Sequence, residues 1–177
     1  WEYDDLGRMT AEYLPDGSVI QAAYDAFGEL LALTDEKGAI WRSEYDANGN
    51  LIATIDPTGV TSRYQYDALG QLSEVQKPGS PSSCYHYDRF GFLQSASSGG
   101  AGIVRFRYSV RGTLLEWVDA GAGITRYHWD SKDRLVATVN PAGGEARIAY
   151  DREDSPVHFT DEQGNVTRFR YNGTGML

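Results

Sequence analysis

The stretch RYQYDALGQLSEVQKPG, residues 63 to 79, contains the pattern on which the fold depends. Two aromatic residues stand two positions apart, and the second, Tyr66, is followed by Asp67, Gly70 and Leu72. An aspartate that opens a tight turn can accept hydrogen bonds from the backbone ahead of it, and a glycine three residues later supplies a positive φ. The residues on either side are typical of strands, so the stretch predicts a turn between two strands.

The same pattern recurs every 21 residues along the chain, without an insertion. Nine dipeptides hold this register: Tyr3-Asp4, Tyr24-Asp25, Tyr45-Asp46, Tyr66-Asp67, Tyr87-Asp88, Tyr108-Ser109, Trp129-Asp130, Tyr150-Asp151 and Tyr171-Asn172. A fixed period of this length is the signature of a repeat architecture. We number each repeat from its tyrosine, which is position 0.

Glycine and leucine follow the tyrosine at fixed distances. Glycine occupies position +4 in most repeats, at Gly7, Gly28, Gly49, Gly70, Gly91, Gly112 and Gly175, and aspartate replaces it at Asp133 and Asp154. Position +6 is Met9, Leu30, Leu51, Leu72, Leu93, Leu114, Leu135 and Leu177, with Pro156 as the exception. The side chains at these positions are therefore expected to have the same role in every repeat.

A second turn signal, D-P-x-G, stands at residues 56 to 59 and in modified form at residues 140 to 143. Proline presets φ for a turn and glycine completes it. Each repeat is thus predicted to be a β-hairpin with two short strands and two turns, and no window shows helical periodicity. The predicted fold is all-β: about 17 strands in a wide, curved antiparallel sheet, because a flat sheet of more than ~10 strands curls or splits. Residues 1–177 are expected to form a single array of eight to nine repeats, incomplete at both ends.

Strand pairing then assigns the two faces. If the first loop holds three residues that end in glycine, the tyrosine at position 0 lies opposite position +6. The aromatic at −2 is then predicted to lie opposite +8, where four repeats carry Ala11, Ala32, Ala53 and Ala137, because large residues pack well opposite small ones. The other face is expected to carry the apolar exceptions Trp117 and Phe159 and the arginines at −3, which are Arg42, Arg63, Arg105, Arg126, Arg147 and Arg168.

Composition excludes several classes of function. The net charge of −9 argues against nucleic acid as a partner, since phosphate binding requires a basic face. No apolar run approaches the ~18–20 residues of a membrane span. The chain begins with Trp1 and shows no leader, so a targeting signal is absent or was removed. A single cysteine, Cys84, excludes an internal disulfide framework.

No residues form a convincing catalytic or metal-binding group. The histidines are His86, His128 and His158. The first two share a register position but stand four strands apart, about 19 Å at ~4.8 Å per strand, which is too far for one metal. The segment from Asp46 to Asn50 resembles a calcium loop only in part, because the full ligand pattern is missing. The sequence therefore predicts a protein that is not an enzyme, with no catalytic, cofactor-binding or metal-binding residues and no cofactor.

The segments YDDLGRM (3–9), YDANGNL (45–51) and YDALGQL (66–72) carry a resemblance to a known family. With the intervening D-P-x-G, they resemble the YD repeats of Rhs proteins, which are also found in insecticidal toxin complexes and in teneurins. The resemblance covers essentially the whole chain. The segments WDSKDRL (129–135) and YDREDSP (150–156) depart from it by lacking the turn glycine.

This resemblance implies a sheet that spirals into a hollow β-shell. In bacterial members the shell encloses a C-terminal toxin of the same polypeptide. The resemblance thus implies this toxin as a partner, with components of a secretion apparatus as further partners. It also implies a protein that is secreted or delivered to the cell surface. The family releases its toxin with acidic residues in a D-P-x-G-rich segment near the C-terminal junction. The residues Asp56-Pro57-Thr58-Gly59 lie at the ordinary repeat turn, so we interpret them as a turn. The open sheet edges of such a fragment predict edge-to-edge self-association.

A surface repeat that binds glycans or mediates adhesion is the alternative. Aromatic-rich repeats near 20 residues also occur in bacterial cell-wall binders, where exposed rings stack on sugars. Those repeats place Trp and Tyr in adjacent runs and lack the Y-D-x-x-G turn. A tyrosine that faces leucine is more simply explained by burial against the sheet. The sequence favours encapsulation and leaves glycan binding as the second hypothesis.

Overall fold

The computed structural model describes residues 1 to 171, all in strands, turns and connecting segments without a helix. Asn172, Gly175 and Leu177 of the last predicted repeat lie outside the described residues. The described part contains seventeen strands, so the predicted all-β class and the predicted number of strands are confirmed. It contains no helix that could span a membrane.

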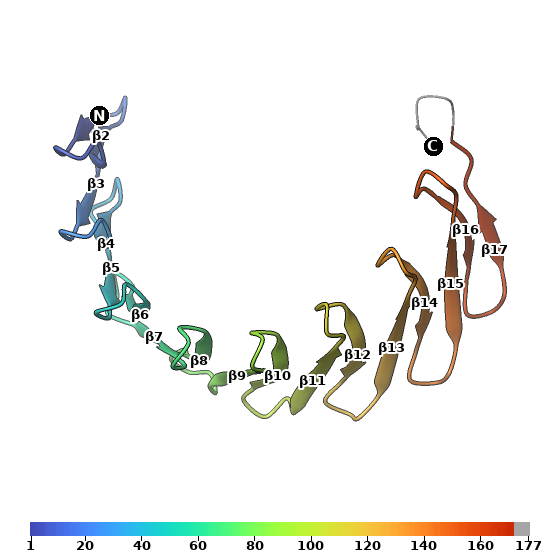
Figure 1. Cartoon of the computed structure of the whole chain (residues 1–177). Coiled ribbons are helices and arrows are strands. Elements are labelled where there is room, and N and C mark those ends of the chain that lie inside the picture. Colours follow the sequence, from blue (N-terminus) through green and yellow to red (C-terminus); the bar gives the residue numbers. More distant parts are fainter. Residues whose placement is uncertain (172–177) are drawn as a thin grey trace. The chain divides into compact units, whose positions relative to one another are not determined.

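The chain divides into two compact units, which we describe separately (Figure 1). Unit 1 comprises Trp1–Tyr85 with Ser98–Gly100, and unit 2 comprises His86–Ser97 and the residues from Ala101 onward. The strands of unit 1 are β1 (Glu2–Tyr3), β2 (Met9–Tyr13), β3 (Val19–Tyr24), β4 (Leu30–Thr34), β5 (Ile40–Tyr45), β6 (Leu51–Ile55), β7 (Thr61–Tyr66) and β8 (Leu72–Gln76).

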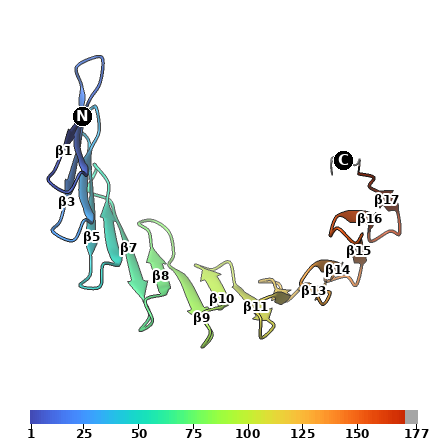
Figure 2. The same ribbon diagram turned by 45° about the horizontal axis from the view of Figure 1, so that its top comes forward.

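The unit boundary falls within β9 (Ser83–Tyr87). The strands of unit 2 are β10 (Leu93–Ser98), β11 (Ile103–Tyr108), β12 (Leu114–Val118), β13 (Ile124–Trp129), β14 (Leu135–Val139), β15 (Glu145–Tyr150), β16 (Pro156–Thr160) and β17 (Val166–Arg168). The last residue of β10, Ser98, is assigned to unit 1. Within each unit every strand pairs antiparallel with the strand that precedes or follows it in sequence, as Figure 2 shows for the successive hairpins.

In most repeats both turns have one geometry; the second turn after Tyr66 differs, with the Ser80 amide bonded to the Lys77 carbonyl and a φ of 71° at Gly79. At the first turn, the Asp67 carboxylate accepts hydrogen bonds from the amides of Leu69 and Gln71, both at 2.9 Å. At the second turn, Asp56 does the same for the amides of Thr58 and Val60. In each case the glycine three residues after the aspartate has a positive φ, 77° at Gly70 and 88° at Gly59. The three-residue loop that ends in glycine is thus confirmed, and Asp56-Pro57-Thr58-Gly59 is a turn.

A β-bulge near the first turn corrects the predicted pairing. Tyr66 lies opposite Leu72, as expected for positions 0 and +6, but the register shifts between Gln65 and Tyr66. Position −2 therefore lies opposite +9 instead of +8, and the prediction that the aromatic at −2 faces alanine is wrong. The same shift occurs in β3–β4, β5–β6, β11–β12, β13–β14 and β15–β16. An extra residue on one strand changes which side chains share a face, because side chains alternate along a strand.

The two faces follow from this register. The tyrosine face carries positions 0, −2 and −4 of the longer strand and +6 and +9 of the shorter one. Trp117 pairs with Phe106, and Phe159 pairs with Ile148, so these two residues lie on the tyrosine face and not on the opposite face. The other face, which we call the arginine face, carries positions −1, −3 and −5 with +8 and +10. The prediction that the −3 arginines and the tyrosines lie on different faces of the sheet is therefore confirmed.

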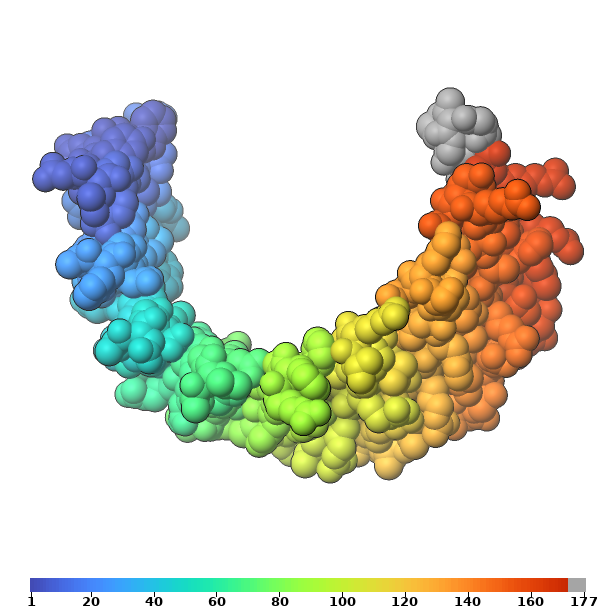
Figure 3. Space-filling model, in the orientation of Figure 1, coloured from blue at the N-terminus to red at the C-terminus, as the bar shows by residue number. Residues whose placement is uncertain are grey.

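The sheet has little buried core. Within residues 1 to 171, the four buried residues are alanines: Ala11, Ala22, Ala53 and Ala137. Three of them stand at +8 on the arginine face, between the −1 residue of their own repeat and the −3 residue of the next. Ala53, for example, lies between Glu44 and Arg63 and is 0% exposed. Each unit is therefore one layer of strands with side chains on both faces, and its hairpins stand out as separate ridges in Figure 3.

Candidate functional site

In most repeats the tyrosine links its hairpin to the preceding one. Its hydroxyl donates a hydrogen bond to the backbone carbonyl of position +6 in the previous repeat: Tyr24 to Met9 (3.1 Å), Tyr45 to Leu30 (3.2 Å), Tyr66 to Leu51 (2.9 Å), Tyr150 to Leu135 (2.9 Å) and Tyr171 to Pro156 (2.8 Å). Because the acceptor is a carbonyl, methionine or proline serves as well as leucine. On the donor side, Trp129 can replace tyrosine because its indole N–H donates to the carbonyl of Leu114 at 2.7 Å.

Position +5 packs on the tyrosine ring of the following repeat. The Arg8 guanidinium lies 4.8 Å from the centre of the Tyr24 ring, and that of Arg134 lies 4.6 Å from the centre of the Tyr150 ring. Phe92 stacks on Tyr108 in the equivalent place, with ring centres 5.3 Å apart. Cations and aromatic rings are both attracted to the face or edge of tyrosine. The arginine in Y-D-x-x-G-R-L, whose role the sequence analysis did not assign, is therefore an inter-repeat contact.

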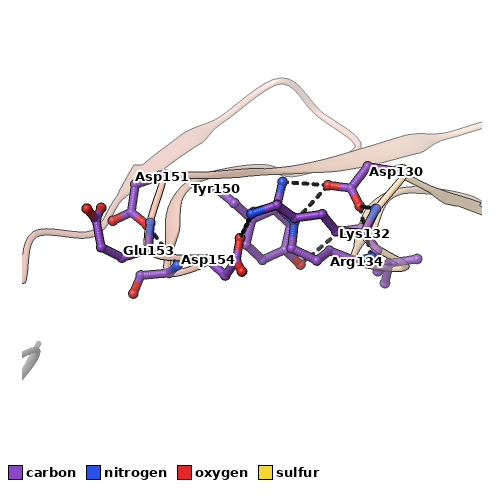
Figure 4. A network of polar contacts seen from close by, with 9 residues as sticks. Asp130, Lys132, Arg134, Tyr150, Asp151, Glu153 and Asp154 are labelled. Atoms are coloured by element: carbon purple, nitrogen blue, oxygen red, sulfur yellow. Dashed lines mark hydrogen bonds and ion pairs between the residues drawn. The ribbon is translucent and has the colours of Figure 1, made fainter.

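Arg134 is the centre of a larger polar network (Figure 4). Its guanidinium binds the Asp130 carboxylate at 2.6 Å within its own turn and also binds Asp154 of the next repeat. The hydrogen bond from Arg134 lowers the pKa of Asp130. Lys132 approaches Asp154 at 2.7 Å, and this hydrogen bond is the main cause of the lowered pKa of Asp154.

The two aspartates that replace glycine lie in ion pairs between neighbouring turns. Asp133 and Asp154 adopt the glycine conformation, with φ of 57° and 65°. Each faces a cation at +3 of the preceding repeat: Arg111 lies 3.8 Å from Asp133, and Lys132 lies 2.7 Å from Asp154. The departures from the repeat pattern thus occur where a neighbouring turn offers a positive charge.

The chemically reactive residues do not converge. His86, His128 and His158 are exposed on the arginine face at separate strands. The Asp46 carboxylate accepts hydrogen bonds from the amides of Asn48 and Asn50 and from the Asn50 side chain, so its oxygens serve the turn. No group of three His, Cys, Asp or Glu side chains within residues 1 to 171 is placed to hold a metal.

Comparison with known proteins defines the family. A family model described as the teneurin YD-shell matches residues 2 to 172, and the chain belongs to this family. YD-shell repeats are structural elements, and the recognition of YD repeats from the sequence is confirmed. A search of curated proteins finds no match.

Solved structures share the fold. The crystal structure of TcdB2-TccC3-TEV matches with a TM-score of 0.76 at 17% identity, over 99% of this chain and 11% of that chain. The crystal structure of TcdB2-TccC3 matches with a TM-score of 0.67 at 18% identity, over 99% of this chain and 13% of that chain. The structure of TcdB2-TccC3 without its hypervariable C-terminal region gives 0.66 at 16% identity, over 98% and 12%. The chain thus spans about an eighth or less of these proteins, and the likeness concerns their fold.

Proposed function

We propose that this chain is a non-catalytic segment of the wall of a YD shell, which encloses and protects a C-terminal toxin polypeptide of the same parent protein. The observation that carries the proposal is the single-layer sheet whose buried residues, in the described part, are all alanine. A packed domain buries large side chains, whereas a wall has two surfaces and needs only lateral contacts. The tyrosine hydrogen bonds and the stacked +5 side chains are such contacts.

The strand stagger supports a sheet that winds. Arg107 lies opposite Glu116, which lies opposite Arg126 of the next hairpin, so position −1 of one repeat is level with −3 of the next. Each hairpin is therefore displaced from the preceding one by two residues along the strand direction, roughly 6.6 Å. The distance between the two hairpins across the sheet is two strand spacings, roughly 9.6 Å. This corresponds to a tilt of about 35°, within the range of strands in closed barrels. A uniform period repeats the same tilt, which favours a spiral.

The finer parts of the proposal rest on the family and on the names of the similar structures. One of the similar structures is TcdB2-TccC3 without its hypervariable C-terminal region. By analogy, the parent of this chain would be an Rhs-type toxin used in competition between bacteria, exported through a secretion apparatus to the medium or the cell surface. Residues 1–177 would form one array within its wall.

The tyrosine geometry favours the wall over the glycan-binding alternative. The repeated tyrosines direct their hydroxyl groups at backbone carbonyls and are half-buried between hairpins. A ring held in this way offers little free face for a sugar, so stacking on a row of these tyrosines would require breaking the inter-repeat contacts.

Limited proteolysis of the full-length parent tests the proposal. One variant lacks residues 46–108, which removes three whole periods and joins Tyr45 to Ser109 in register. We expect the C-terminal segment to be digested slowly in the intact parent and rapidly in the deletion variant. The C-terminal segment expressed alone gives the rate without protection. Equal rates of digestion of the C-terminal segment in the parent and in the variant would refute the proposed container function and favour the glycan-binding hypothesis.

We also propose that this chain self-associates through its sheet edges. β17 pairs with β16 on one side, and a strand at the end of a sheet presents backbone groups that another chain can bind. Sedimentation velocity over a range of concentrations should show an average mass that rises with concentration. A monomer at every concentration would contradict this proposal while leaving the container unaffected.

A further inference from the structure

The arginine face differs in charge between the two units. In unit 1 its cations are Arg42 and Arg63, and these are accompanied by Glu2, Glu44 and Glu74. In unit 2 the same face carries more arginines than glutamates. Its strand cations are Arg105, Arg107, Arg126, Arg147 and Arg168, with His86, His128 and His158 on the same face, and its acids are Glu116 and Glu145. The protein is acidic as a whole, so this basic surface is a local feature.

The acids of unit 2 leave most of this charge exposed. Glu116 is shared between Arg107 at 3.4 Å and Arg126 at 3.3 Å. Glu145 binds Arg147 at 2.9 Å, which raises the pKa of that arginine. The side chains of Arg107 and Arg147 nevertheless remain 61% and 68% exposed. Each therefore retains N–H donors toward solvent, since a guanidinium has five.

Shallow grooves run between these side chains. One is lined by Arg105 and Arg107 with Val118, and another by Arg147 and Arg168 with Val166. Polar as well as apolar side chains complete the linings, among them Glu116 in the first groove and His158 in the second. The equivalent groove of unit 1 is lined instead by Glu2, Gln21 and a series of alanines and threonines. Of these three grooves, the two that arginines line lie in unit 2, although the backbone is the same.

We propose that the arginine face of unit 2 binds an extended acidic segment of a polypeptide that crosses the strands. Guanidinium groups bind carboxylates through paired hydrogen bonds, and several exposed cations in a row attract a chain of like negative charge. Val118 and Val166 in the two grooves offer apolar contact to its uncharged residues. This binding does not require the container function, and it is tested separately.

The repeat spacing defines the segment further. Equivalent arginines on β11, β13, β15 and β17 are separated by two strands and by the two-residue stagger, which gives about 12 Å between Cα atoms. An extended chain advances about 3.3 Å per residue. Carboxylates at every third or fourth residue would therefore match successive arginines.

Fluorescence anisotropy with a labelled peptide tests the inference on the intact 177-residue chain. The probe is a Gly/Ser peptide of about 12 residues with glutamate at every third or fourth position, which when fully extended is long enough to reach from Arg105 to Arg168. In about 20 mM salt, where charges are little screened, we expect saturable binding. The triple variant Arg105→Gln/Arg126→Gln/Arg147→Gln should bind roughly tenfold more weakly, in line with the loss of three exposed ion pairs. Circular dichroism verifies that the variant is folded.

Two further variants keep the result interpretable. The matched control, Arg42→Gln/Arg63→Gln, removes the equivalent arginines of unit 1 and should leave the affinity unchanged. Glu116→Gln removes the carboxylate that neutralises Arg107 and Arg126 and should tighten binding a few-fold. A gain in affinity cannot be caused by misfolding, so this variant tests the charge argument directly.

Several outcomes would overturn the inference. These are the absence of peptide binding, equal weakening by the unit 1 control, and weaker binding by Glu116→Gln. An isomeric peptide with its glutamates grouped at one end should bind several-fold more weakly, and equal affinity would contradict docking along the row. Tighter binding of a double-stranded oligonucleotide than of the peptide would identify the surface as a nucleic-acid site instead.

Discussion

The turn that follows each repeated tyrosine has the same backbone in both units but different side chains. The turns of Tyr24 and Tyr66 represent unit 1, and those of Trp129 and Tyr150 represent unit 2. In unit 1, Gly28 and Gly70 occupy the left-handed position, and the tips of these turns carry Phe27 and Leu69, which are 93% and 75% exposed. In unit 2, Asp133 and Asp154 occupy that position. Their neighbours at +3 are charged, and ion pairs connect one turn with the next.

This comparison shows what the turn glycine does. Its function is to adopt a positive φ, because the space around the Cβ position of Gly70 is empty. Aspartate tolerates that conformation better than most residues, and in unit 2 its charge also binds a cation of the adjacent turn. Glycine is therefore replaceable where the lateral ion pair offsets part of the backbone strain.

The largest expected effect concerns the tyrosine that both units share. Tyr66→Ala and Tyr150→Ala should each lower the free energy of unfolding by about 2–3 kcal/mol, below the range for fully buried rings because these are half-buried. Both hydroxyls donate at 2.9 Å, but Arg134 stacks only on Tyr150, so Tyr150→Ala should cost more. Urea denaturation measures both. Tyr13→Ala, on the opposite face, is the control and should have a much smaller effect; a similar loss there would refute the special role of position 0.

The second effect tests the glycine itself. Gly70→Val should cost on the order of 1–2 kcal/mol, all of it from left-handed strain, because no atom lies within 4 Å of the added Cβ. Ala68→Val in the same exposed loop is the control and should change stability by less than about 0.5 kcal/mol. Equal effects in thermal unfolding would show that bulk at the turn, and not its φ, decides stability.

The third effect is that of restoring glycine at the positive-φ positions of unit 2 where another residue stands. Ala122 has a φ of 65° at the second turn and no ion pair to compensate, so Ala122→Gly should stabilise the protein by about 1 kcal/mol. Asp133→Gly should act in the same direction, since it loses only the long contact with Arg111. Asp154→Gly should gain less than either, because it loses contacts with both Lys132 and Arg134. A destabilisation by Asp133→Gly as large as that of Gly70→Val would mean that the turns do not share one geometry.

The smallest effect is a dependence on pH that arises from the ion pair of Lys132 with Asp154. Because the pKa of Asp154 is lowered in the folded protein, its contribution is present above the ordinary value of 3.8 and is lost as the pH falls through the folded value. Lys132→Ala should therefore be less stable than the wild type at pH 7. The difference should diminish below about pH 4 and in high salt. A difference that is constant with pH would show that Lys132 acts through packing.

The sequence by itself determined the local structure of this protein. The spacing of Tyr66, Asp67 and Gly70 predicts the turn, since the aspartate hydrogen bonds and the positive φ involve only residues within the loop. The repeat period extended this result along the chain and indicated the family. Even Asp133 and Asp154 were recognisable as occupants of the glycine position, because their place in the register is a property of the sequence.

Only the tertiary structure decided which side chains share a face and which repeats touch. The bulges beside Tyr108 and Tyr150 place Trp117 and Phe159 on the tyrosine face, because the location of an extra residue is set by the pairing of two strands and not by either strand alone. The stacking of Arg134 on Tyr150 likewise joins residues of different repeats. The basic surface of unit 2 depends on both effects, since the bulge places +8 beside −1 and the stagger places it beside −3 of the next repeat.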